Sequence, residues 1–227
     1  MDAQFMLNVP FFAGLNEKEY ELLGSLFIEK NIKKGGHIFL EGDVGTEFYL
    51  IKQGRVKIYR ITNGKESILS LLNNGDYFGE MAMLDPNNSR SAAAVALENT
   101  TLFILKENEW KSLLMRNPQL LIKLLSLTME KLRRANDKIQ HLTFFDVRTR
   151  VYKLIVQLAK DYGIHTEDGL LINYKLTHQQ MADLIGAVRE TVSKIMAELQ
   201  QEEWITLQNK KILIKDMANF EEGIIED

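Results

Sequence analysis

Two different hydrophobic patterns divide the chain. Between residues 32 and 105, apolar residues come in short runs separated by turn residues, which is typical of β-strands. The predicted strands cover residues 37–40, 47–52, 55–61, 67–72, 92–97 and 101–105. The pair Asn63-Gly64 is a strong signal for a hairpin turn between two of them. An antiparallel barrel or jelly roll is expected, because closing the sheet removes exposed edges and encloses room for a small ligand.

Helical spacing of apolar residues occurs on both sides of these strands. Residues 8–27 predict a short helical lead-in with Asn16 as the N-cap. Pro118 precedes a long helical segment that reaches residues 141–144, since the first helical turn tolerates proline. Asp146 is expected to cap the next helix, and an apolar strand should follow it. The expected fold is α+β, in three parts that cover residues 1–116, 117–144 and 145–227.

The long helical segment carries a heptad repeat. One heptad position holds Leu125, Leu132 and Ile139, and the other holds Leu121, Thr128, Ala135 and Leu142. A helix buried against its own barrel would show a similar repeat. Charged residues flank this one, however, and leave an apolar stripe so narrow that it suits a two-fold partner. A parallel homodimer through the dimerisation helix at 117–144 is predicted.

Composition narrows the functional class. The 227 residues are 45% hydrophobic and 26% charged, which is ordinary for a globular protein of one or two domains. There is no apolar run of about eighteen residues and no signal-peptide pattern, so we expect a cytoplasmic protein with no membrane partner. The absence of cysteine excludes disulfides, thiolate metal sites and cysteine nucleophiles. A net charge of −3 means that any DNA contact must come from a local basic face.

The sequence contains no pattern that points to catalysis. A metal-dependent enzyme on a similar barrel would need clustered histidines, and the four histidines here are scattered along the chain. No nucleophile–base pair and no paired acids stand in a pocket-like context. We therefore predict no catalytic residue and no metal ligand. Haem held by an isolated histidine is an alternative that the colour of the purified protein would decide.

Residues 75–84, with the Ser89-Arg90 pair after a polar turn, predict a pocket for a ribose phosphate. Gly79 has no Cβ, so an anion could approach its backbone, and the helical turn that follows offers free N–H groups. Arg90 supplies a planar fork that fits phosphate. Glu80 accepts hydrogen bonds only and would repel an anion unless it faced a donor such as a ribose hydroxyl. The predicted effector contacts of this stretch are Gly79, Glu80, Met81, Ala82, Arg90 and Ser91.

Residues 176–196 predict a helix-turn-helix. Thr177 and Gln180 form a capping box, and Gly186 allows the tight turn between two amphipathic helices. Outward side chains early in the second helix are those that meet base edges, although a solvated charged face is the ordinary alternative. Residues 208–211, between two short apolar strands, predict a basic wing tip. The predicted DNA contacts are Thr177, His178, Gln179, Arg189, Glu190, Thr191, Ser193 and Lys194.

Both motifs resemble those of one family. The run F-G-E-x-x-x-L, with R-S-A six residues after the leucine, resembles the phosphate-binding cassette of the cyclic-nucleotide-binding domain in Crp/Fnr bacterial regulators. The run R-E-T-V-S-K resembles the recognition helix of that family, and the resemblance covers nearly the whole chain. It implies an N-terminal jelly-roll β-barrel and a C-terminal winged helix-turn-helix. It also implies a cyclic nucleotide effector, with cyclic AMP expected first, a palindromic operator with TGTGA-like half-sites, and RNA polymerase as a partner.

The resemblance also places Lys131, Ala135 and Asn136 of the long helix at positions that face the ligand. Family members that bind cyclic AMP commonly offer arginine and hydroxyl side chains there. Ala135 cannot hydrogen-bond through its side chain, and Asn136 offers both a donor and an acceptor, so the base is left open. Two alternatives remain. One is a regulator of the same family that is constitutive or senses another small molecule, and the other is a cyclic-nucleotide signalling module that does not bind DNA.

Overall fold

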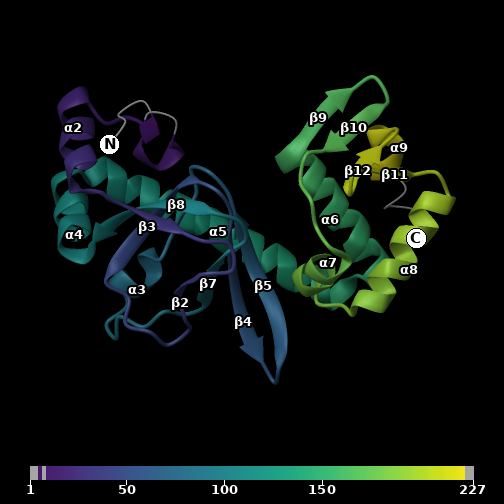
Figure 1. Ribbon diagram of the computed structural model, residues 1–227, viewed down its shortest axis with the longest axis horizontal. Coiled ribbons are helices and arrows are strands. Elements are labelled where there is room, and N and C mark those ends of the chain that lie inside the picture. Colours follow the sequence, from purple (N-terminus) through teal and green to yellow (C-terminus); the bar gives the residue numbers. More distant parts are fainter. Residues whose placement is uncertain (1–4, 7–8, 223–227) are drawn as a thin grey trace. The chain divides into compact units, whose positions relative to one another are not determined.

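The computed structural model describes residues 5–6 and 9–222 (Figure 1). The chain forms two compact units, Met1–Leu132 and Arg133–Asp227, and the boundary falls inside one long helix. Each unit has its own sheets and helices.

The first unit is built on two antiparallel four-stranded sheets (Figure 1). One sheet has the order β1-β8-β3-β6, and the other has the order β2-β7-β4-β5. The strands are β1 (Ile28–Ile32), β2 (His37–Phe39), β3 (Glu47–Gln53), β4 (Val56–Thr62), β5 (Lys65–Leu72), β6 (Tyr77–Phe78), β7 (Ala93–Ala96) and β8 (Thr100–Lys106). This arrangement confirms the predicted jelly roll, as two packed sheets rather than one closed barrel.

Strand β3 shows why the core of this unit has two layers. Four consecutive residues of β3 are buried, so both of its faces are covered. Tyr49 and Ile51 pack into the cluster between the two sheets, whereas Phe48 and Leu50 pack into a second cluster with the helices. In the second cluster the Phe48 ring stacks on Trp110, with ring centroids 4.3 Å apart.

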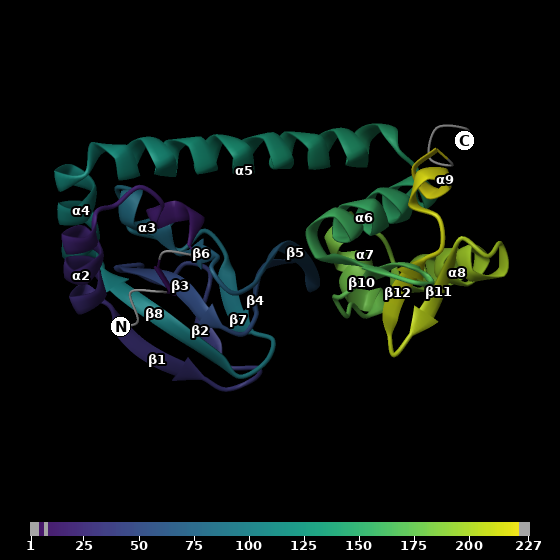
Figure 2. The same ribbon diagram turned by 90° about the horizontal axis from the view of Figure 1, so that it is seen from above.

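Among the residues that the structure describes, α-helices and a short 3-10 helix complete the first unit and its connection to the second. They are η1 (Pro10–Phe12), α2 (Glu17–Leu26), α3 (Glu80–Leu84), α4 (Glu107–Arg116) and α5 (Pro118–Phe144). Asn16 caps α2 in a capping box with Glu19, as predicted. Helix α5 is continuous over its 27 residues (Figure 2). Its Leu120 and Leu124 are buried in the cluster that contains Trp110.

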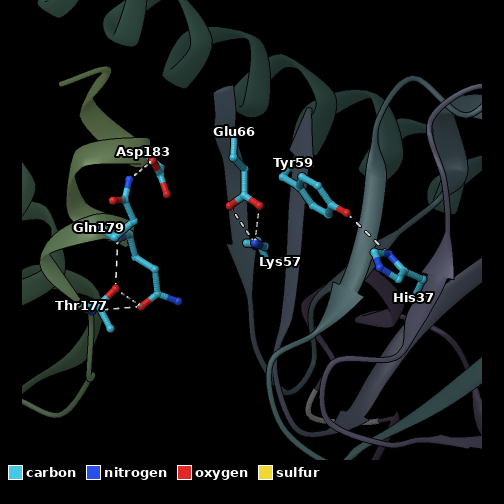
Figure 3. A network of polar contacts seen from close by, with 8 residues as sticks. His37, Lys57, Tyr59, Glu66, Thr177, Gln179 and Asp183 are labelled. Atoms are coloured by element: carbon cyan, nitrogen blue, oxygen red, sulfur yellow. Dashed lines mark hydrogen bonds and ion pairs between the residues drawn. The ribbon is translucent and has the colours of Figure 1, made fainter. Parts of the chain in front are cut away.

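The hairpin of β4 and β5 turns at the predicted residues. Asn63 and Gly64 have φ values of 53° and 74°, the left-handed conformation that this type of turn requires. Across the two strands, Lys57 Nζ lies 2.7 Å from Glu66 Oε1 (Figure 3). This half-buried ion pair is diagonal, since Lys57 stands opposite Leu71 and Glu66 opposite Ile61, and it links the two strands of the hairpin.

The second unit is a winged helix. It contains α6 (Val147–Tyr162), β9 (Gly163–Thr166), β10 (Gly169–Ile172), α7 (His178–Ile185), α8 (Arg189–Gln201), β11 (Ile205–Gln208), β12 (Lys211–Ile214) and α9 (Met217–Glu222). The four strands form one sheet in the order β11-β12-β10-β9. Asp146 caps α6 by accepting from the Thr149 N–H at 2.8 Å, as predicted. The turn of the wing lies at Asn209 and Lys210, which both have positive φ.

Candidate effector pocket and DNA-reading face

Arg90 is the centre of the predicted phosphate pocket, and it is only 3% exposed. Its Nη1 donates to the carbonyl oxygen of Gly79 at 2.8 Å, and its Nη2 donates to that of Glu47 at 3.0 Å. The guanidinium lies 4.2 Å from the centroid of the Phe39 ring. Burial lowers the pKa of Arg90, but an arginine stays charged at neutral pH. The Nε–H is buried without a hydrogen-bond partner, so the site retains a donor that an anion could use.

Two glycines leave room for this guanidinium. Gly79, the N-cap of α3, has φ 85°, and a Cβ there would lie 2.8 Å from Arg90 Nη1 and 2.9 Å from the Glu47 oxygen. A Cβ on Gly45 would lie 2.6 Å from Arg90 Nε. The backbone of Gly79 is thus packed against Arg90. The absence of a Cβ is needed for this packing, whether or not an anion also approaches. The sequence alone does not indicate Gly45, because only the tertiary fold brings it to Arg90.

Glu80 is the acidic member of the pocket and is 7% exposed. Its Oε1 lies 2.9 Å from Nζ of Lys131, which comes from α5. The same Nζ lies 4.4 Å from the centroid of the Tyr77 ring. The structure therefore brings together four of the proposed effector contacts, Gly79, Glu80, Arg90 and Lys131. The lysine offsets the negative charge of the buried acid, which would otherwise oppose a bound anion.

The remaining predicted effector contacts lie in different surroundings. Ser91 is exposed, and its Oγ lies 3.9 Å from the sulfur of Met81. Ala82 is buried, so only its backbone N–H could donate a hydrogen bond to a ligand. Ala135 and Asn136 are exposed residues of α5 in the second unit, and their contact with a nucleotide base stays a prediction.

The helix-turn-helix has the predicted local geometry. Thr177 Oγ1 accepts from the Gln180 N–H at 3.1 Å, and Gln180 Oε1 accepts from the Thr177 N–H at 3.0 Å (Figure 3). Gln179 donates to Asp183 one turn later, at 2.8 Å. Gly186 ends α7 in the left-handed conformation, with φ 65°. These contacts fix both ends of α7 and the direction of the turn that leads to α8.

The second helix of the motif, α8, buries one face and exposes the other. Its buried residues are Val192, Ile195, Met196 and Leu199. Arg189, Glu190 and Lys194 are exposed, and Thr191 is half-buried. Ser193 is also half-buried, and its Oγ lies 2.9 Å from His178 Nδ1, a contact that joins α8 to the start of α7. Val188 stands at the N-cap without a side-chain cap, which leaves N–H groups at the start of α8 available to a phosphate.

Two absences hold for the residues that the structure describes. Among them, no helix is both long enough and apolar enough to cross a lipid bilayer. Nor does the described part of the chain group three or more histidine, aspartate or glutamate residues in a way that could hold a metal ion.

Comparison with known proteins identifies the family. Residues 29–117 match the family model of the cyclic nucleotide-binding domain, and residues 149–222 match that of the Crp-like helix-turn-helix domain. The cyclic AMP receptor protein of Thermus thermophilus is 34% identical over 218 residues, which cover 96% of this chain and 97% of that relative. The chain belongs to the Crp/Fnr family of transcription regulators. Its members regulate transcription and are not enzymes.

Other known proteins are similar to this chain over most of their length. The CRP-like cAMP-activated global transcriptional regulator of Mycobacterium tuberculosis is 30% identical over 214 residues, 94% of this chain and 95% of that relative. The global nitrogen regulator of Synechococcus elongatus is 29% identical over 187 residues, 82% of this chain and 84% of that relative. The fold is similar to that of a CooA mutant from Carboxydothermus hydrogenoformans, with a TM-score of 0.82 and 23% identity over 96% of this chain and 95% of that one.

Proposed function

We propose that the protein is a homodimeric regulator whose affinity for its operator is controlled by a cyclic nucleotide, with cyclic AMP as the first candidate. The observation that carries the proposal is the buried Arg90 with an unused Nε–H beside the buried acid Glu80. A cyclic nucleotide presents a phosphate anion next to a ribose hydroxyl. One arginine and one acid in a single pocket match those two groups in charge and in hydrogen bonding.

Further groups fit the same ligand. The exposed hydroxyl of Ser91 can donate to the phosphate, and Lys131 keeps Glu80 from repelling it. Ala135 and Asn136 are proposed to face the base. Two relatives of this chain, from Thermus thermophilus and Mycobacterium tuberculosis, are named for cyclic AMP, which supports it as the first candidate.

The second unit is proposed to read the operator. Arg189 at the start of α8 can contact guanine, and Glu190 can accept from cytosine. Lys194, about one turn later, can reach a further base or a phosphate. The other proposed DNA contacts are Thr177, His178, Gln179, Thr191 and Ser193. The operator is proposed to be a palindrome of two TGTGA-like half-sites about 34 Å apart, and RNA polymerase in the cytoplasm is the proposed partner on DNA.

The dimer is proposed to form through α5. Leu125, Leu132 and Ile139 are 58%, 52% and 62% exposed in the single chain. Leucine and isoleucine repeated at heptad spacing lose this exposure when two parallel helices pack side by side. Burying apolar surface then stabilises the pair by roughly 25 cal/mol for each Å² removed from water.

The experiment is calorimetric titration with cyclic AMP and with cyclic GMP, without DNA and with a duplex of two TGTGA half-sites. We expect saturable heat with one nucleotide and tighter operator binding in its presence, by roughly 5- to 150-fold. Ser91→Ala should lower the affinity for that nucleotide about tenfold, because it removes one hydrogen bond to a charged group. The free energy of unfolding should not change, because the position is exposed. Ser70→Ala, an exposed serine of β5, is the matched control.

One observation favours a second candidate, a family member that needs no effector. Lys131 already partners Glu80, and two main-chain oxygens already partner Arg90, so the pocket satisfies much of its own charge. This candidate requires operator binding that no nucleotide changes. A signalling module without DNA binding requires instead that nucleotides bind and that no duplex is shifted in a gel.

A further inference from the structure

The first turn of α6 carries two arginines that reach into the helix-turn-helix. From their contacts we infer that Arg150 is a positioning residue for DNA recognition, which holds the turn between α7 and α8 and thereby sets where α8 begins. The inference deepens the proposed function and rests on its DNA-reading part. It does not depend on which effector the first unit binds.

Arg150 joins two segments of main chain. Its Nη1 donates to the carbonyl oxygen of Ile185 at 2.6 Å and lies 3.4 Å from that of Gly186. Its Nε donates to the carbonyl oxygen of Asp146, the N-cap of its own helix, at 3.3 Å. The guanidinium thus connects the start of α6 to the end of α7 directly.

The carbonyl groups that accept from Arg150 Nη1 lie at the C-terminal end of α7, where a cation is favourable. The last carbonyl groups of a helix have no partner within the helix, and the helix dipole places negative partial charge on them. Ile185 is the last residue of α7, and Gly186 follows it in the left-handed conformation. Arg189 is the first residue of α8, three positions after Gly186. A displacement of the turn therefore moves the start of the helix that is proposed to meet the bases.

Neighbouring contacts show which part of α8 depends on Arg150. A Cβ on Gly186 would lie 3.1 Å from Leu142 Cδ2 and 3.7 Å from Arg150 Nη1, so these two side chains cover the turn. Arg148 holds the other half of α8, with Nη1 3.0 Å from Glu198 Oε2 and Nη2 2.8 Å from Glu202 Oε2. Removing the Arg150 guanidinium should free the start of α8 while Arg148 and the buried face keep the helix in place.

The test is Arg150→Met in the full-length protein. The probe is the duplex that the wild-type protein enriches from a random-sequence pool, compared with a scrambled duplex of the same length. Affinity for the enriched duplex should fall about tenfold, as for loss of a hydrogen bond to a charged group. Affinity for the scrambled duplex should stay within about twofold, because non-specific binding depends on phosphate contacts that remain. The slope of log affinity against log salt should not change.

Two variants serve as references. Lys160→Met removes a positive charge from the same helix, where Lys160 Nζ pairs with Glu221 Oε1 at 3.0 Å, and it should bind both duplexes as wild type does. Arg150→Lys keeps the charge but has no fork, and should lose several-fold in affinity for the enriched duplex only. If circular dichroism shows that Arg150→Met does not fold, Arg150→Lys is compared with the wild type in its place.

Three results would overturn the inference. The first is a folded Arg150→Met protein, or failing that an Arg150→Lys protein, with undiminished affinity for the enriched duplex. The second is an equal loss of affinity for both duplexes, together with a slope of log affinity against log salt that is smaller by about one. This result would show that Arg150 contacts a phosphate. The third is a loss of affinity for the enriched duplex that is the same in Arg150→Met and in Lys160→Met. The loss would then follow from the missing positive charge and not from the position of Arg150. Should the wild-type protein enrich no duplex, the DNA-reading function itself fails, and that outcome is distinct from the other three.

Discussion

Arg90 shows how the surroundings of one side chain decide what it can bind. A surface arginine would offer its whole fork to a ligand, but Arg90 already donates to the oxygens of Gly79 and Glu47 and packs against Phe39. A buried cation is costly unless it is well partnered. Two carbonyl oxygens partner it only in part, because neither carries a full negative charge. An anion that accepts from the buried Nε–H would supply the hydrogen bond and the negative charge that Arg90 lacks.

The space around this guanidinium leads to a prediction for Gly45→Ala. The new Cβ would lie 2.4 Å from Ala82 Cβ and 2.7 Å from Arg90 Cζ, closer than real Cβ atoms come to such neighbours. Arg90 is held on several sides and cannot move away cheaply, so the pocket must distort. We expect nucleotide affinity in calorimetric titration to fall at least tenfold, and the free energy of unfolding to fall by about 1–3 kcal/mol through overpacking.

Gly64→Asn is the control for Gly45→Ala. Gly64 lies at the tip of the β4–β5 hairpin, where a Cβ would have no neighbour within 4 Å, and asparagine tolerates the positive φ of this position. This variant should bind nucleotide as the wild type does. Wild-type nucleotide affinity in Gly45→Ala would show that the close approach to Arg90 is irrelevant to the ligand.

At the scale of the element, features that depend on neighbours in sequence could be predicted. The caps by Asn16, Asp146 and Thr177 are local, since each side chain accepts from an N–H group three residues later. Strands β1 and β9 were not predicted. Nearly all of their residues are exposed, so they lack the alternation that identifies a strand, and they exist because an adjacent strand supplies the hydrogen bonds.

The exposed start of α8 yields a prediction for Arg189→Ala. If Arg189 meets a guanine, its loss should cost about 1–3 kcal/mol of operator binding and relax the preference at one base pair. Binding to wild-type and singly substituted operators would measure both effects. Arg189 is exposed at the start of α8, so its guanidinium is accessible to a duplex.

Arg116→Ala is the matched control for Arg189→Ala, because it removes an exposed arginine from α4 in the first unit. It should leave operator binding unchanged. An Arg189→Ala protein that loses the same affinity on operator and on random duplexes would show that Arg189 touches a phosphate and reads no base.

At the scale of the whole molecule, the order of the parts was predictable and the contacts between distant segments were not. The cassette motif indicated Glu80 and Arg90 because both lie in one short stretch, and the family resemblance added Lys131. Nothing in the sequence indicated that Lys131 pairs with Glu80 or that Gly45 lies against Arg90, since these contacts join segments more than forty residues apart. The jelly roll and the α5 packing that bring them together are tertiary features.

The proposed dimer leads to a prediction for the apolar stripe of α5. Leu132→Glu puts a charge in the middle of the exposed heptad stripe of α5, where a partner helix would have to bury it. We expect sedimentation velocity to show a monomer in place of a dimer, with each unit still folded. Operator affinity should then fall by about 100-fold or more, because the two half-sites are no longer read by linked domains.

Ile28→Glu provides the comparison, because Ile28 of β1 is 53% exposed and lies outside the heptad stripe. Its dimer and its operator affinity should match those of the wild type. A Leu132→Glu protein that stays dimeric would place the interface elsewhere on the molecule. A monomer that keeps full operator affinity would mean that a single copy reads the site, and a palindrome would then have no structural basis.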